Sequence, residues 1–140
     1  AMDVECIEYN IMPINSRAKG ARFERYLALW FRDEGWADAK RGCQHAGRDV
    51  NTGQDAPDLI VPGLTEWLHI EAKHVERLQL QDAYDQARRD ASGVGKIPCV
   101  IHKRNSTDPL VTISLEDFAQ FLRGDLPPNN ENQTKENENE

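Results

Sequence analysis

This 140-residue sequence has no apolar run long enough to cross a bilayer, no CxxC pair and only three cysteines. A membrane-spanning helix needs about 20 consecutive apolar residues, so no membrane association is expected. Cys6, Cys43 and Cys99 are an odd number and lie far apart, which argues against a disulfide framework and favours a reducing compartment. We therefore expect a soluble protein that works in the cytoplasm.

The sequence also lacks an excess of basic residues, since its net charge is −7. Such a balance is unusual for a protein that binds nucleic acid. However, residues 1–11 and 129–140 each carry −3, which leaves −1 for the residues between them. Basic residues are clustered within this middle part, and a bound divalent cation would offset several acids. The acidic composition is therefore only weak evidence against a DNA substrate.

Composition divides the chain into three parts. Residues 1–14 are expected to be irregular, and Ala1-Met2 is interpreted as part of an expression tag. Residues 15–124 hold the apolar content of one domain. Residues 125–140 contain Pro127-Pro128 near their start and continue as an Asn/Glu tract with almost nothing to bury, which predicts a disordered acidic tail.

Three helices are predicted from apolar residues that recur three and four positions apart. They are expected at 15–34, at 79–91, and between Ser114 and Gly124, with Gly35 and Gly93 following the first two. Ser114 and Asp117 resemble a capping box. On the first helix, the stripe expected to be buried is Phe23, Leu27, Trp30 and Phe31. The second helix carries a periodic stripe of Leu80, Ala83, Tyr84, Ala87 and Ala91, and the third carries Leu115, Phe118 and Leu122.

Strands are predicted within 56–61 and at 67–73, 97–102 and 110–113, with a weak strand at 37–41. The glycine and polar content of residues 42–54 predicts a long mobile loop. The resulting order is α, weak β, β, β, α, β, β, α. This order favours an α/β fold with one mixed β-sheet and flanking helices.

Two of these strands are joined by the turn signal Pro62-Gly63. In the second strand, alternation places Trp67, His69, Glu71 and Lys73 on one face. If the strands pair in antiparallel fashion, Asp58 comes to lie alongside Glu71. Two carboxylates and an amine would then share one small site.

Such a site suits the chemistry of phosphodiester hydrolysis. Mg²⁺ takes oxygen ligands and retains several waters, so Asp58, Glu71 and the backbone carbonyl of Ala72 would suffice to hold it. Lys73 would then orient or deprotonate the attacking water. Asp49 and Asp55 are alternative carboxylate ligands.

A zinc site is the other metal centre that the residue types suggest. Cys43 with His45, and Cys99 with His102, have the spacings Cys-x-His and Cys-x-x-His, which match no common structural zinc pattern. We therefore predict no zinc site. His45 is interpreted instead as a residue of the loop that faces the substrate, together with Arg48.

The whole pattern resembles the PD-(D/E)XK nuclease superfamily. Pro57-Asp58 is followed after twelve residues by Glu71-Ala72-Lys73, and Glu24 lies on the preceding helix. More narrowly, residues 16–122 are similar to archaeal-type Holliday junction resolvases and their phage-encoded relatives. The resemblance implies a restriction-endonuclease-like αβββαβ core and a Mg²⁺ or Mn²⁺ cofactor.

The resemblance also implies roles for individual residues. Asp58 and Glu71 would be metal ligands, Glu24 a further ligand directly or through water, and Lys73 the residue that handles the water. Gln86 is a secondary candidate. Phosphate contacts are expected near Glu24 because basic residues are densest there, and the candidates are Arg17, Lys19, Arg22, Arg25, Arg41 and Arg48.

If the resolvase resemblance holds, the protein is a homodimer that makes paired nicks in a four-way DNA junction, in the host cytoplasm if it is phage-encoded. The candidate interface residues are Leu78, Leu80, Tyr84 and Leu110. Two alternatives remain open at this point. One is a restriction-like or end-processing nuclease of the same fold, and the other is a non-catalytic DNA-binding protein on this scaffold.

Overall fold

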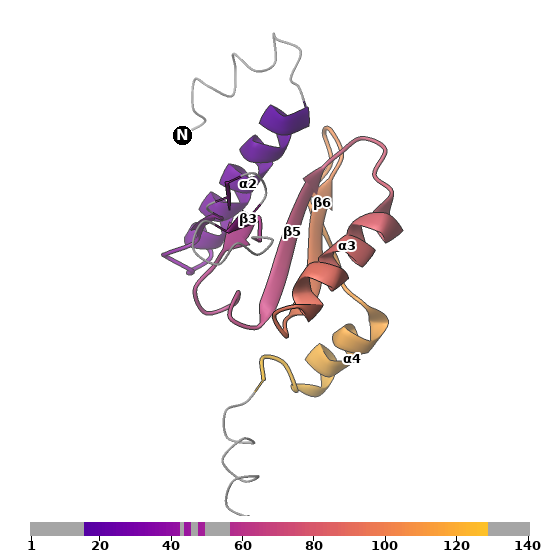
Figure 1. Cartoon of the computed structure of the whole chain (residues 1–140). Coiled ribbons are helices and arrows are strands. Elements are labelled where there is room, and N and C mark those ends of the chain that lie inside the picture. Colours follow the sequence, from indigo (N-terminus) through magenta and orange to yellow (C-terminus); the bar gives the residue numbers. More distant parts are fainter. Residues whose placement is uncertain (1–15, 43, 46–47, 50–56, 129–140) are drawn as a thin grey trace, which may run out of the picture.

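The computed structural model describes residues 16–42, 44–45, 48–49 and 57–128. The expected irregular segment at 1–14, most of the expected acidic tail, Cys43 and Asp55 lie outside these residues. Element labels follow Figure 1. Within the described part, no helix combines the length and the apolarity that crossing a membrane would require.

The three predicted helices are present as α2 (Ser16–Asp33), α3 (Leu80–Ser92) and α4 (Leu115–Arg123). The Oγ of Ser114 accepts a hydrogen bond of 3.0 Å from the N–H of Asp117, which confirms the predicted cap of α4. Gly124 then ends this helix with a φ of 79°, a left-handed conformation that favours glycine.

The sheet is mixed, as predicted. β5 (Leu68–His74) and β6 (Ile97–Lys103) run parallel, and β7 (Leu110–Thr112) pairs with β6 in antiparallel fashion. A parallel pair needs a crossover connection, which α3 provides. β1 (Lys40–Arg41) pairs in antiparallel fashion with β4 (Leu59–Ile60) beside this sheet. The order of α2, β1, β4, β5, α3 and β6 is consistent with the αβββαβ core.

The expected long loop after β1 contains a short hairpin. β2 (Gln44–His45) and β3 (Arg48–Asp49) pair in antiparallel fashion. The prediction of an irregular loop was therefore wrong for these four residues. The polar sequence gives little sign of this hairpin because two-residue strands carry no detectable alternation.

Helices cover both faces of the sheet, with α2 on one side and α3 on the other (Figure 1). The core under α2 is the larger one, and α3 contributes small alanines that let it approach β6 closely. The α2 core contains Phe23, Leu27, Ala28, Phe31, Ala39, Leu59, Val61, Ile70, Ala72, Cys99 and Ile101. The α3 core contains Ala83, Ala87 and Val100, with Leu78 and Tyr84 packed against them.

One expectation about burial was wrong, and one apolar stripe has no neighbour that covers it. Trp30 is 45% exposed, although its ring packs edge-on against Phe31 with 5.2 Å between centroids. The stripe on α4 is also exposed, and Leu115 is 82% accessible. α4 lies beyond the end of the sheet (Figure 1), where Phe121 packs against Trp67. The helical period was correct, but it does not reveal whether a neighbour exists to cover the apolar side.

Gly42 follows β1 and lies against the backbone that leads into β4. Its N–H donates a hydrogen bond of 3.0 Å to the carbonyl oxygen of Asp58. A Cβ atom at this position would overlap the carbonyl oxygen of Pro57. Since the obstacle is backbone, it cannot rotate away, and the position requires glycine.

We predict that Gly42→Ala destabilises the protein by about 1–3 kcal/mol, because the extra methyl group forces the 57–58 backbone to shift. Gly20→Ala is the matched control. Gly20 lies within α2, and a Cβ atom there would meet nothing within 4 Å, so alanine should stabilise the protein by roughly 0.5–1 kcal/mol. Urea unfolding of both variants measures these changes, and equal stability of the two would contradict the close approach at Gly42.

Candidate active site

Asp58 is attached to the edge of β5 by two hydrogen bonds. Its backbone N–H donates to the carbonyl oxygen of Ile70 at 3.3 Å, and its Oδ2 accepts from the N–H of Ala72 at 2.8 Å. These partners lie on either side of Glu71. The proximity of Asp58 and Glu71 that the sequence suggested is thus present, through a local contact and not through a regular hairpin.

The ladder of β5 determines which backbone groups face Asp58. Ile97 donates to the carbonyl of Trp67, and Val75 donates to the carbonyl of Lys103, so the odd-numbered residues of β5 pair with β6. In a strand, successive backbone groups point to opposite edges. The carbonyl of Ala72 is therefore directed to the edge where Asp58 is bound, which suits its expected role as a ligand.

Glu71 is a buried acid with only 5% of its surface accessible. Its Oε1 lies 2.8 Å from Nε2 of His69, which is itself 2% exposed. Burial raises the pKa of Glu71 to about 7, and the neighbouring Asp58 acts in the same direction, while the bond to His69 opposes both.

Glu24 comes from α2 and lies within electrostatic range of Asp58. Its Oε2 accepts a hydrogen bond of 2.9 Å from Nε of Arg41 on β1. The pKa of Glu24 is raised, first by burial and further by the negative charge of Asp58, against the effect of Arg41. Asp58 therefore acts on both Glu24 and Glu71. Among the described residues, however, the group of acids and histidines whose ligand atoms all lie within 4.8 Å of one another is His69, Glu71 and Asp90, and it does not include Glu24 or Asp58.

The types of donor around Asp58 suit a hard divalent cation. Glu24, Asp58, Glu71 and the Ala72 carbonyl offer oxygen atoms only, as Mg²⁺ prefers. Burial raises the pKa of Glu24 and of Glu71, so it disfavours their ionised forms. A cation near these oxygens would favour the ionised forms.

Lys73 and Gln86 complete the predicted site residues. Lys73 is half-buried and lies two residues beyond Glu71, on the same side of β5. Gln86 is exposed on α3. The residue of α3 that comes near Glu71 is Asp90, one helical turn after Gln86.

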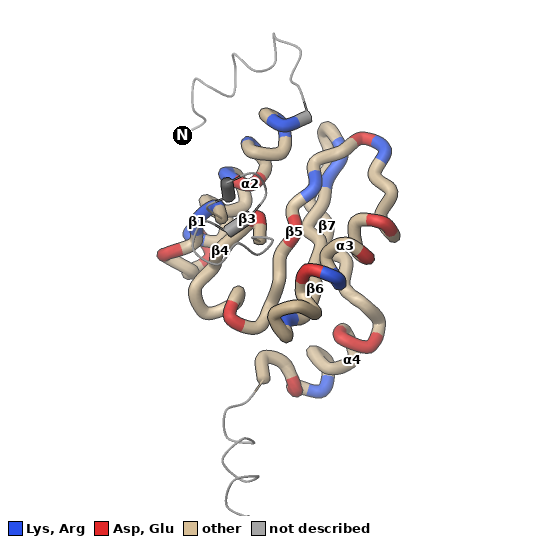
Figure 2. The backbone as a smooth tube through the Cα atoms, in the orientation of Figure 1, with Lys and Arg blue, Asp and Glu red and all other residues tan. Residues whose placement is uncertain are grey.

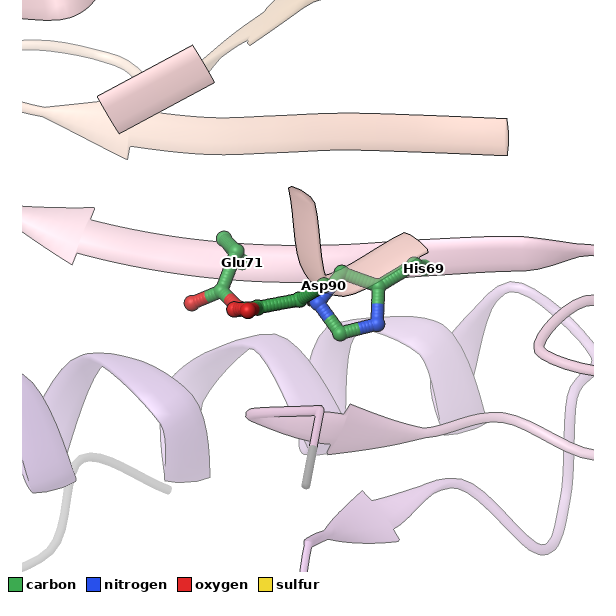
Figure 3. A group of neighbouring side chains, drawn as sticks. All are labelled: His69, Glu71 and Asp90. Carbon is green, nitrogen blue, oxygen red and sulfur yellow. Dashed lines mark hydrogen bonds and ion pairs between the residues drawn. The ribbon is translucent and has the colours of Figure 1, made fainter. Parts of the chain in front are cut away.

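Asp90, His69 and Glu71 form a cluster between α3 and β5 (Figure 3). One ligand atom from each lies within 4.8 Å of the others. No role was predicted for His69 or Asp90 from the sequence. The sequence does contain a signal for each residue. Alternation in β5 places His69 on the same face as Glu71. The helical spacing from Ala83 and Ala87 places Asp90 near the buried side of α3.

The expected phosphate-binding residues do not form one group. Arg17 and Arg25 are exposed on α2, whereas Arg41 is paired with Glu24. The backbone of Arg48 lies in β3 and that of His45 in β2, and their side chains, like that of Asp49, are outside the described part of the structure.

Lys19 and Arg22 of α2 lie close enough to His74, the last residue of β5, to affect its charge. The pKa of His74 is lowered, first by burial and then by the positive charges of Lys19, Lys103 and Arg22. Figure 2 shows basic segments of α2 and of the ends of β5 and β6 at the same end of the molecule. The fold thus adds Lys103 to the basic residues of α2, although the two segments lie far apart in the sequence.

Cys99 and His102, which were considered and rejected as zinc ligands, have other roles. Cys99 is buried in the core under α2, and burial raises the pKa of its thiol to about 12. Nε2 of His102 lies 2.8 Å from Oγ1 of Thr112 across the β6–β7 pair. Neither arrangement suggests a metal.

The raised pKa of Glu71 predicts how stability depends on pH without metal. Between the ordinary value of 4.5 and about 7, the folded protein binds more protons than the unfolded chain. The melting temperature in EDTA should therefore be highest near pH 5 and fall as the pH rises through 7. Glu24, whose pKa is also raised, contributes in the same direction.

Glu71→Gln provides the control for this prediction, because glutamine does not titrate. The groups that face Glu71 are Asp58, His69 and Asp90, and all of them are kept in this variant. Its melting temperature should change less than that of the wild type between pH 5 and 8. Parallel profiles for the two proteins would show that Glu71 is not the titrating group.

Comparison with known proteins identifies a matching family. A family model described as "Phage putative PDDEXK endonuclease" matches residues 15–140. Neither the curated proteins nor the solved structures give a significant match.

Proposed function

This chain belongs to that phage PDDEXK endonuclease family, and we propose that it is a Mg²⁺- or Mn²⁺-dependent DNA endonuclease that acts selectively on four-way junctions. The observation that carries the catalytic part is the arrangement around Asp58, whose carboxylate is bound to β5 beside the buried Glu71 and whose charge raises the pKa of both Glu71 and Glu24. Partly buried acids that disfavour one another's ionised forms are more common at functional sites than elsewhere, and this supports a site for a cation.

Each residue has a defined task in this proposal. Glu24, Asp58, Glu71 and the Ala72 carbonyl would hold the metal, which would polarise the scissile phosphate and lower the pKa of a water. The Ala72 N–H donates a hydrogen bond to Oδ2 of Asp58 and so fixes the orientation of this carboxylate. Lys73 orients the attacking water or accepts its proton. Arg41 neutralises and positions Glu24.

The DNA is proposed to lie across the basic end of the molecule. Lys19, Arg22 and Lys103 converge around His74, three residues beyond Glu71 on β5. At about 3.3 Å per residue in a strand, His74 lies roughly 10 Å along β5 from Glu71. The His74 side chain packs against Phe23 on the α2 face, whereas the Glu71 side chain lies on the α3 face, so a DNA strand that contacts both must pass the edge of β5 where Asp58 is bound. Arg17 and Arg25 extend the same surface along α2, and Arg48 with His45 are proposed to approach the DNA from the β2–β3 hairpin.

A junction has two symmetric strands to cut, whereas one chain offers one such site. We therefore propose a homodimer. The free edge of β7 supports it, because β7 pairs only with β6 among the described strands, and Leu110 and Val111 are exposed on it. Of the other interface candidates, Leu80 is exposed, while Leu78 and Tyr84 pack against the α3 core.

The function is tested with a labelled four-way junction and a duplex of the same arm sequence. Wild-type protein with Mg²⁺ should nick the junction in two symmetric strands and leave the duplex largely intact. Asp58→Asn, Glu71→Gln and Lys73→Ala should each reduce the cleavage rate by at least about 100-fold, because they remove a metal ligand or the water-handling amine.

Binding and folding provide the controls for this experiment. The three variants should still bind the junction and should unfold cooperatively, since they leave the apolar core unchanged. Equal cleavage of junction and duplex would indicate another nuclease of this fold. Junction binding without cleavage of any DNA by the wild type would indicate a non-catalytic DNA-binding protein.

The proposed DNA path predicts a change in salt dependence. In the double variant Lys19→Gln/Lys103→Gln, the slope of log affinity against log salt should become shallower by up to nearly two units, about 0.9 for each phosphate that is no longer neutralised. Affinity should fall to a similar degree for all sequences, because phosphates carry no sequence information.

Arg89→Gln/Lys96→Gln is the matched control for charge. It removes two positive charges from α3 and the loop after it, on the other side of the sheet, and both variants then have the same net charge. Its salt slope should equal that of the wild type. If instead the control changes the slope and the Lys19/Lys103 variant does not, the DNA binds on the α3 side.

A further inference from the structure

His69 is an unusual residue to find in the middle of this strand. It is a polar side chain with 2% exposure in β5, and its Nε2 lies 2.8 Å from Oε1 of Glu71. Burying an imidazole is unfavourable unless it makes a hydrogen bond, and an apolar side chain would fill the same space without that requirement. The contact to Glu71 therefore needs a reason beyond packing.

The protonation state of Glu71 determines the direction of this hydrogen bond. When Glu71 is ionised, as a metal ligand is, its carboxylate can only accept, so Nε2 of His69 carries the hydrogen and donates it. The distance of 2.8 Å lies in the range of hydrogen bonds to a charged acceptor. Oε1 is then occupied by His69, and the carboxyl group of Glu71 also contacts the side chain of Asp58, the neighbouring proposed ligand.

We propose that His69 is a positioning residue of the nuclease site, which holds the Glu71 carboxylate so that its second oxygen is presented to the metal. This inference rests on the proposed function of Glu71 as a ligand. Hydrogen bonds from a second layer of residues fix ligand orientation in many metal sites, and their removal typically lowers metal affinity or activity 10- to 100-fold. His69 has the required donor, the required distance and a buried, constrained position.

Asp90 raises a competing possibility. Together with His69 and Glu71 it could hold a cation directly, since one atom from each lies within 4.8 Å of the others. That site would use His69 Nε2 as a ligand, so the nitrogen could not also donate a hydrogen to Glu71. The two roles of His69 are therefore mutually exclusive and can be separated by experiment.

The test measures Mn²⁺ affinity by calorimetry in the absence of DNA. His69→Leu removes the donor and should weaken Mn²⁺ binding about 10- to 100-fold. His69→Gln places an amide N–H close to the position of Nε2 and should restore affinity to within a few-fold of the wild type. In cleavage assays, His69→Leu should lower kcat at saturating DNA while leaving KM for the junction nearly unchanged.

Two further variants serve as controls. His102→Leu removes another strand histidine with a 2.8 Å hydrogen bond, here to Thr112, and should leave Mn²⁺ affinity unchanged. Asp90→Asn should also leave it unchanged if His69 only positions Glu71. Loss of a bound ion in both Asp90→Asn and His69→Gln would instead show that the three residues hold a cation, and the proposal would be overturned.

The wild-type protein gives an independent measurement in case His69→Leu does not fold. In ¹⁵N spectra, the metal-free protein at pH 8 should show His69 with its hydrogen on Nε2, and Mg²⁺ should shift this signal more than that of His102. A hydrogen on Nδ1 alone would overturn the proposal. If the wild type binds no divalent ion, the proposed function of the site fails, and this outcome is distinguishable from a failure of His69 alone.

Discussion

The hydrogen bond from the Ala72 N–H to the Asp58 carboxylate connects the two parts of the sheet at the point where the chemistry is proposed. β4 is only two residues long and pairs with β1, so it cannot form a continuous ladder with β5. Asp58 replaces that ladder with one backbone and one side-chain bond to β5. Because Gly42 in turn binds the carbonyl of Asp58, the positions of β1, β4 and β5 all depend on this residue. The same contact sets the distance between Asp58 and Glu71.

Acidic and basic side chains form separate clusters in this protein, and the net charge of −7 does not reveal this separation. Carboxylates gather where α2 faces the start of β4 and the edge of β5, while Lys19, Arg22 and Lys103 gather farther along β5 around His74. Both clusters are unfavourable in isolation because like charges repel. In the proposed function, a metal ion would satisfy the first cluster and a phosphate backbone would satisfy the second. The proposal thus accounts for both unfavourable groupings, as two parts of one surface for nucleic-acid cleavage.

Much of the fold was predictable because its signals are local. Helical spacing located α2 and α3, and the Pro57-Asp58 and Glu71-Ala72-Lys73 pattern identified the strands that carry the acids. The structure places these acids together, and their catalytic roles remain predictions. Properties that depend on distant neighbours were not predictable. Trp30 and the stripe of α4 have the right period for burial, yet no neighbouring element of the described chain covers them. The β2–β3 hairpin is too short to leave a periodic pattern, and Lys103 joins Lys19 only through the parallel pairing of β5 with β6.

β5 carries nearly all of the proposed chemistry, and it does so by using different parts of each residue. The side chains of His69 and Glu71 lie on the α3 side, the backbone groups of Ile70 and Ala72 face Asp58, and the Ile70 and Ala72 side chains fill the core under α2. A strand that is fixed on both faces and at both edges has little freedom to adapt to different substrates. If the proposed metal site cleaves DNA, it is therefore expected to cut any phosphodiester that reaches it. The proposed selectivity for a branched substrate would then come from what limits access, namely the basic end of α2, the β2–β3 hairpin and the spacing between two sites in the proposed dimer.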